Sequence, residues 1–145
     1  TVRDNLGISL EYAGAARASA PGSASAEEIL RSMGLEAKTD LRPGGLTQIE
    51  MRKLELARAM AAHPKLLISD EAMAGLSSTE VDDILEILFR LNAQGITIIM
   101  IEHIMRAVMR FSERIVVLDA GERIAEGTPD EIVRHPAVER AYLGE

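Results

Sequence analysis

Two acidic residues follow one short apolar run of this chain, and a histidine follows another. Residues 66–69 lead into Asp70 and Glu71, and the apolar run 96–101 is followed within two residues by His103. Such runs are typical of strands buried on both faces of a parallel sheet, and ligands of α/β sheets bind beyond the carboxyl ends of the strands. We therefore expect the two acids and the histidine to meet at one sheet edge.

This combination of groups suits a nucleotide site, but only part of one. A nucleotide site also needs a cradle for the phosphates, and the sequence contains no GxxxxGK[ST] loop. Half of such a site is therefore missing from these residues.

Composition limits the possible classes of protein. The 145 residues include no cysteine and have a formal net charge of −7, with basic residues dispersed among acids, so we expect no nucleic-acid partner and a reducing, cytosolic setting. The longest uninterrupted apolar stretch, 96–101, is far shorter than the roughly 20 residues that span a bilayer. Because the chain begins at Thr1 without an initiator methionine, we expect it to be a piece of a longer protein.

The first 63 residues are predicted to be mainly helical. The spacing of apolar residues predicts a helix at 1–12, followed by a loose connection at 13–26. A capping box of Ser25 and Glu28 begins the second helix, which ends at Gly34. A turn at 42–45 precedes the third helix, which runs from Thr47 to His63.

From residue 64 onward strands and helices alternate. We expect strands at 66–69, 96–101, 115–118 and 123–125, and helices that begin at Ser77, Ile104, Pro129 and Ala137, the first of them ended by Gly95. This alternation predicts parallel crossovers and an α/β core, while the last two strands form a hairpin. The chain thus divides into a helical portion (1–63), an α/β portion (64–127) and a helical tail (128–145).

Several short motifs occur together in a fixed order. They are LTQIE followed by LELARAM, LLISDE, AGLS at residues 74–77, IEH at residues 101–103, and the closing IAEGTPDEIVRHPAVERAYLGE. In order and spacing they resemble the signature, Walker B strand, D-loop, switch-histidine strand and C-terminal end of the ATP-binding subunits of ABC transporters. Among these the chain is most similar to the branched-chain amino acid importers, and the resemblance covers it as the second half of such a subunit.

The resemblance implies a fold and three roles. The fold is α/β, a partial RecA-like parallel sheet core with a helical signature subdomain in front. Asp70 would hold Mg²⁺, through water, because this hard ion prefers carboxylate oxygen and keeps several waters. Glu71 would polarise the attacking water, and His103 would hold the γ-phosphate and that water in line.

The same resemblance assigns nucleotide contacts to Thr47, Gln48, Ile49, Glu50 and Ser77. In the family, a signature segment at a helix N-terminus binds the γ-phosphate of ATP held by the other subunit. Thr47 keeps a hydroxyl, but both signature glycines are replaced, Ile49 adds bulk and Glu50 adds a carboxylate near a phosphate. We therefore expect a weakened half-site, or its replacement by a better one in a heterodimeric partner.

The implied parent protein is an ATP hydrolase that uses ATP and Mg²⁺ to power an importer, and this chain is one part of it. Its implied partners are a second ATPase subunit, identical or different, and transmembrane permease subunits at the inner face of the plasma membrane. The alternative is a non-catalytic module that docks on a permease or on another ATPase.

A receiver-like domain with Asp70 as phosphoacceptor is disfavoured, because it needs further acids near the first strand and a lysine near the last. We expect that this span alone does not hydrolyse ATP and that it exposes apolar sheet surface.

Overall fold

A computed structural model describes residues 1–15 and 25–143 of the chain. Most of the loose connection expected at 13–26 lies outside the described residues. The chain divides into two compact units, Thr1–Ile101 and Glu102–Glu145. The division at residues 63 and 127 that the sequence suggested stays a prediction.

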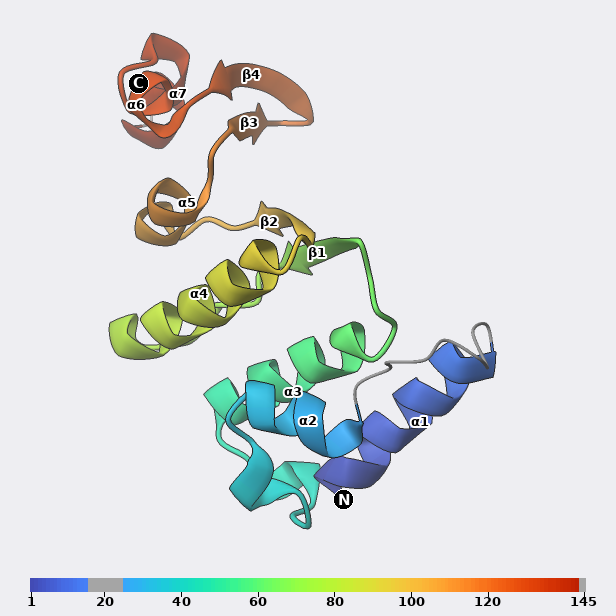
Figure 1. The fold of residues 1–145 in the computed structure, drawn as a ribbon. Coiled ribbons are helices and arrows are strands. Elements are labelled where there is room, and N and C mark those ends of the chain that lie inside the picture. The colour runs from blue at the N-terminus through green and yellow to red at the C-terminus, as the bar shows by residue number, and fades with distance from the viewer. Residues whose placement is uncertain (16–24, 144–145) are drawn as a thin grey trace. The chain divides into compact units, whose positions relative to one another are not determined.

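Three packed helices begin the first unit (Figure 1). They are α1 (Val2–Ala15), α2 (Ala26–Ser32) and α3 (Gln48–Met60), with short 3₁₀ helices η1 (Glu36–Lys38) and η2 (Pro43–Gly45) between the last two. Leu6, Leu30 and Ala57, one from each α-helix, are fully buried among them. The helices that the sequence predicted are confirmed, although α3 ends three residues before His63.

The second part of this unit is a strand–helix–strand crossover. Strands β1 (Leu66–Asp70) and β2 (Thr97–Ile101) pair in parallel, in a register that sets Ile68 opposite Ile99 and Asp70 opposite Ile101. Helix α4 (Ser78–Ala93) connects them and packs on β2 (Figure 1). The parallel crossover predicted from the alternating pattern is confirmed for these two strands.

The expectation that these strands are buried on both faces is wrong, and the expectation that this span exposes apolar sheet surface is confirmed. Leu67 and Ser69 of β1 are buried, but Leu66 and Ile68 on its other face are exposed. Exposure alternates along β2 as well, and Ile99 and Ile101 are about half exposed. Side chains alternate between the faces of a strand, so one face of this two-stranded sheet is packed and the other is open. We call Leu66, Ile68, Ile99 and Ile101 the open apolar face.

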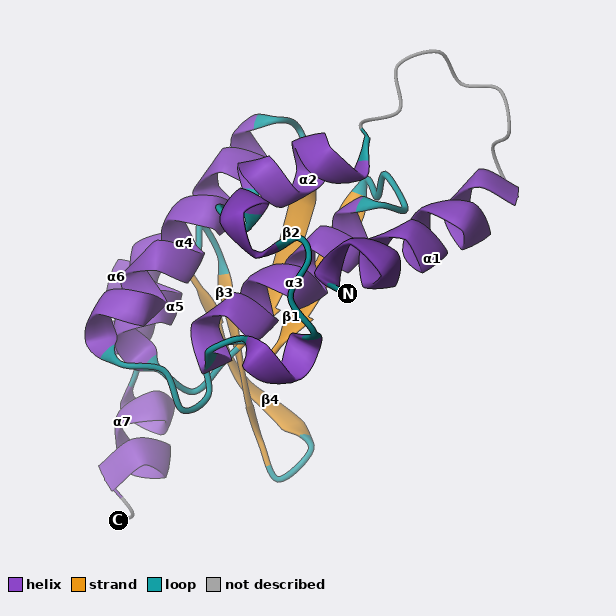
Figure 2. Cartoon of the chain, turned by 90° about the horizontal axis from the view of Figure 1, so that it is seen from below, coloured by secondary structure: helices purple, strands orange, loops and turns teal. Residues whose placement is uncertain are grey.

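The second unit is built around a β-hairpin (Figure 2). Helix α5 (Met105–Phe111) leads into strands β3 (Ile115–Asp119) and β4 (Glu122–Gly127), which pair antiparallel as predicted, and helices α6 (Pro129–Val133) and α7 (Pro136–Leu143) pack on β4. The core of this unit consists of Ile115, Ala125, Ile132 and Val138. Among the described strands β3 pairs only with β4, so the parallel crossover expected into this third strand stays a prediction.

Candidate functional site

Asp70 and Glu71 stand at the carboxyl end of β1. Asp70 is the last residue of the strand, and the backbone N–H of Glu71 donates to the carbonyl oxygen of Ile101 at 2.9 Å. This bond continues the parallel ladder by one residue, so both acids are fixed to the sheet edge where α/β sheets bind ligands. Both side chains are exposed and are therefore accessible to a ligand.

The chain turns sharply at Glu71. Its φ of 46° lies in the left-handed region, which costs a non-glycine residue about 1–2 kcal/mol. The turn that follows is held by a hydrogen bond from the Ala74 N–H to the Glu71 carbonyl at 3.2 Å, and by Met73, whose side chain is fully buried. His63 and Ala120 share this left-handed conformation, each with a φ of 47°, so the role of Glu71 stays a prediction.

The signature-like residues form the first turn of α3. Thr47 is the N-cap, with its hydroxyl accepting from the Glu50 N–H at 3.4 Å, and the Glu50 carboxylate accepts from the Thr47 N–H at 2.9 Å. The Thr47 N–H lowers the pKa of the Glu50 carboxyl, burial opposes this shift, and Lys38, 3.5 Å away, lowers the pKa further. Glu50 is therefore a carboxylate at neutral pH that caps its own helix.

Gln48 joins this helix to the turn after β1. Its side-chain amide N–H donates to the Ala74 carbonyl at 3.0 Å, across 26 residues of sequence. The structure therefore brings the first turn of α3 against the segment that follows Glu71, inside the first unit. Ile49, the bulky residue in place of a signature glycine, is half-buried in the same helical turn.

Ser77 is the N-cap of α4. Its hydroxyl accepts from the Glu80 N–H at 3.4 Å and donates to the Glu80 carboxylate at 2.7 Å, while the Ser77 N–H donates to that carboxylate at 2.8 Å. The backbone bond from Ser77, followed by the hydroxyl bond, lowers the pKa of the Glu80 carboxyl. The hydroxyl predicted to contact nucleotide thus also serves as a helix cap.

His103 belongs to the second unit. It follows β2 by two residues, precedes α5 and is exposed. Its meeting with Asp70 and Glu71 stays a prediction.

The predicted magnesium ligand is a single carboxylate. Among residues 1–15 and 25–143 no group of three or more acidic or histidine side chains has the arrangement of a metal site. Mg²⁺ is commonly bound by one or two carboxylates together with substrate phosphates and water. An exposed Asp70 at the sheet edge fits that mode of binding, and does not fit a site made of protein ligands alone.

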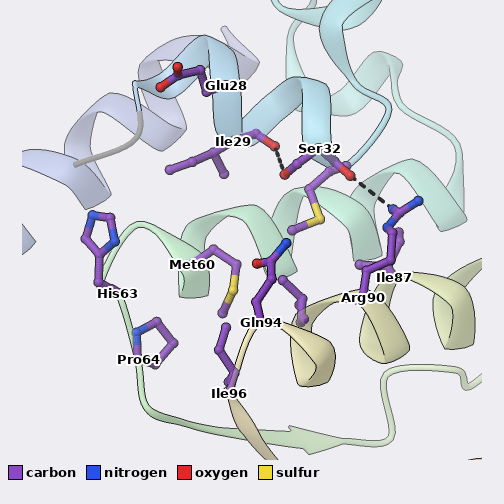
Figure 3. A pocket seen from close by; sticks show the side chains of 12 residues that line it. Glu28, Ile29, Ser32, Met60, His63, Pro64, Ile87, Arg90, Gln94 and Ile96 are labelled. Atoms are coloured by element: carbon purple, nitrogen blue, oxygen red, sulfur yellow. Dashed lines mark hydrogen bonds between the residues drawn. The ribbon is translucent and has the colours of Figure 1, made fainter. Parts of the chain in front are cut away.

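A pocket of about 380 Å³ lies elsewhere in the first unit (Figure 3). Its lining includes the apolar side chains of Ile29, Met60 and Ile87, and Arg90, which also lines it, donates to the Ser32 carbonyl at 3.1 Å. None of the predicted site residues lines it. The pocket therefore does not coincide with the predicted site at the sheet edge.

Two features of the site were missed in the sequence. The capping box of Thr47 and Glu50 has the same S/T-x-x-E spacing as the one predicted at Ser25 and Glu28, so its signal is present in the sequence. The contact between Gln48 and Ala74 has no local signal, because it depends on tertiary packing.

Comparison with known proteins relates the chain to ATP-binding transport proteins. Residues 122–145 match the family model described as branched-chain amino acid ATP-binding cassette transporter. The chain is 42% identical over 103 residues to the high-affinity branched-chain amino acid transport ATP-binding protein BraF of Pseudomonas aeruginosa, covering 70% of this chain and 40% of BraF. It is 36% identical over 148 residues to the methionine import ATP-binding protein MetN 1 of Burkholderia orbicola, covering 100% of this chain and 42% of that relative.

A solved structure shows the same likeness. The ATP-binding cassette MJ1267 of an ABC transporter, in its ADP conformation, aligns with a TM-score of 0.75 and 31% identity over 81% of this chain and 48% of the cassette. The chain therefore belongs to the ATP-binding cassettes of ABC transporters, with a partial RecA-like core. It corresponds to the C-terminal part of such a subunit. It spans about 40% of the length of the curated relatives described above.

Proposed function

We propose that this chain is the part of an ATP-hydrolysing importer subunit that acts on the γ-phosphate of ATP. The observation that supports this most strongly is the placement of Asp70 and Glu71 at the carboxyl edge of β1, locked to β2 by the Glu71–Ile101 hydrogen bond. Relatives named as ATP-binding transport proteins add independent support. The phosphate-binding loop would come from a separate part of the whole protein.

Each residue has a distinct task in the proposed mechanism. Asp70 would hold Mg²⁺ through water, and the bound ion would supply positive charge that offsets the charge of the ATP phosphates. Glu71 orients and polarises the attacking water, which lies in line with the γ-phosphate. His103 donates to a γ-phosphate oxygen and keeps the water in place.

A second subunit completes the proposed site. The N-terminus of α3, with the backbone N–H groups of Gln48 and Ile49, faces the γ-phosphate of ATP held by that subunit, and Ser77 contributes from the start of α4. Ile49 and the Glu50 carboxylate weaken this half-site, which favours a heterodimer whose second signature is stronger. In this proposal residues 1–63 form the signature subdomain, 64–127 the ATPase core and 128–145 the C-terminal helices.

The proposed location is the inner face of the plasma membrane. Among the described residues, no helix has the length and apolar character needed to cross a bilayer. Permease subunits would therefore provide both the membrane attachment and the transport path. We propose branched-chain amino acids as the transported solute, since the family model and BraF share that description, whereas MetN 1 is named for methionine.

The test uses a complete cassette in which this chain follows the upstream portion of BraF. The cassette should hydrolyse ATP in the presence of Mg²⁺, and Asp70→Asn should raise the Mg²⁺ concentration required for half-maximal turnover. Asp83→Asn makes the same chemical change at an exposed position on α4 and should leave that requirement unaltered. Turnover that is absent in the parent cassette, or equal Mg²⁺ requirements in the two variants, would support the non-catalytic docking module instead.

A further inference from the structure

Gln48 makes a contact that the signature role does not need. A signature segment acts through backbone N–H groups, yet the Gln48 side chain is directed within its own chain to the Ala74 carbonyl. A carbonyl oxygen only accepts hydrogen bonds, so the amide must present its N–H group there. The first turn of α3 and the turn after Glu71 are joined at this point.

Gly75 makes room for that contact. A Cβ built at residue 75 would lie 2.5 Å from Gln48 Nε2 and 3.4 Å from its Cδ, so any larger residue would displace the amide. The φ of Gly75 is 77°, a left-handed conformation that also favours glycine. The Gln48 amide therefore occupies the space that a side chain at residue 75 would need, and we call this contact of Gln48 with Ala74 and Gly75 the junction.

The junction lies four residues or fewer from Glu71. Ala74, whose carbonyl receives the Gln48 N–H, donates its own N–H to the Glu71 carbonyl at 3.2 Å. A continuous series of hydrogen bonds therefore runs from the N-terminus of α3 through Ala74 to the backbone of Glu71. Glu71 adopts a strained φ of 46°, which persists only where surrounding contacts hold it.

We infer that Gln48 is a positioning residue, which ties the γ-phosphate-facing end of α3 to the turn that orients Glu71. The inference rests on the proposed function for its catalytic consequence, but the tie itself requires no nucleotide. The two copies of a dimer would each contain this link. A phosphate bound at the end of α3 would thereby order the water-activating residue of the same chain.

The tie is tested first on the whole 145-residue chain without nucleotide. Gln48→Ala should raise amide hydrogen exchange at Ala74 and Leu76 about two- to tenfold, the range expected for loss of one hydrogen bond. The same change at Gln94, at the end of α4, should leave these amides unaltered. Equal exchange in Gln48→Ala and the parent chain would overturn the tie.

A double-mutant cycle gives a second and independent measure. Gly75→Ala should destabilise the chain more when Gln48 is present than when it is alanine, because only the Cβ–amide clash depends on Gln48, whereas the cost of the left-handed backbone is common to both. Purely additive effects on the unfolding midpoint would contradict the junction. This test remains valid if single variants are less stable.

The catalytic consequence is tested in the completed cassette. Gln48→Ala and Gln48→Glu, which lacks the N–H donor, should lower kcat about five- to tenfold while KM for ATP changes less than twofold, and Gln48→Lys should restore part of the loss by donating to the Ala74 carbonyl. Unchanged kcat in Gln48→Ala, beside an inactive Glu71→Gln cassette, would overturn the positioning role alone. A Glu71→Gln cassette as active as the parent would instead overturn the proposed function.

Discussion

The open apolar face should make the isolated chain associate with itself. Its residues Leu66, Ile68, Ile99 and Ile101 are 48–59% exposed and lie on one side of the two paired strands. Full burial of such a side chain is worth about 1.5–3 kcal/mol, so covering the exposed half of each is worth roughly 0.8–1.5 kcal/mol. A contiguous apolar surface of this kind favours contact with a second copy.

Replacing Ile68 and Ile99 together tests this directly, since the two residues are directly opposite each other in the register. Ile68→Thr/Ile99→Thr keeps β-branched side chains that suit a strand and removes roughly 1.5–3 kcal/mol of the association energy from each copy. The dissociation constant should rise at least about tenfold, as each 1.4 kcal/mol is a factor of ten. Sedimentation velocity over a wide concentration range measures the change.

The matched control is Val133→Thr. Val133 is 62% exposed on α6, outside the sheet, so its replacement should leave the sedimentation profile as it is in the parent chain. A parent chain that stays monomeric at every concentration, or a double variant that associates as strongly as the parent, would refute the reasoning.

Three further predictions concern single groups and the isolated chain. Ser69→Ala should raise the free energy of unfolding by about 1 kcal/mol, because the Ser69 hydroxyl is buried and has no hydrogen-bond partner among the described residues; a lower thermal midpoint would contradict this. The pKa of Glu80 is lowered from 4.5, so its carboxylate stabilises the fold above about pH 4.5 and this contribution is lost as the pH falls through the lowered value. Glu80→Gln should therefore show a shallower decline of the urea midpoint on acidification, and an identical pH profile would refute the cap as its source. The isolated chain should not turn over ATP with Mg²⁺, and phosphate release that depends on Glu71 would disprove this.

The sequence predicted the elements of the fold well because their signals are local. The capping boxes at Ser25 and Ser77 mark helix starts, Gly95 adopts φ 90° at the end of α4 as a cap glycine does, and the hairpin turn lies between β3 and β4. Burial was predicted less well. An apolar run does not reveal whether one or both faces of a strand are covered, because the covering layer comes from distant residues.

In the candidate site, too, local features could be predicted from the sequence and features that depend on tertiary packing could not. Asp70 and Glu71 could be placed at a strand end from the apolar run alone, and the pairing of β1 with β2 confirms that position. Neither the left-handed φ of Glu71 nor the link from Gln48 to Ala74 has a signal in the residues around it. Both depend on how the turn packs against α3, which only the folded chain defines.

The most direct test of the central claim is single-turnover ATP hydrolysis by the completed cassette with Glu71→Gln. The amide keeps the shape of the side chain but cannot accept the proton of the attacking water, so the account predicts that ATP still binds while hydrolysis slows by about a hundredfold or more. A Glu71→Gln cassette that hydrolyses bound ATP at the parent rate would contradict the assignment of the β1 edge as the catalytic site.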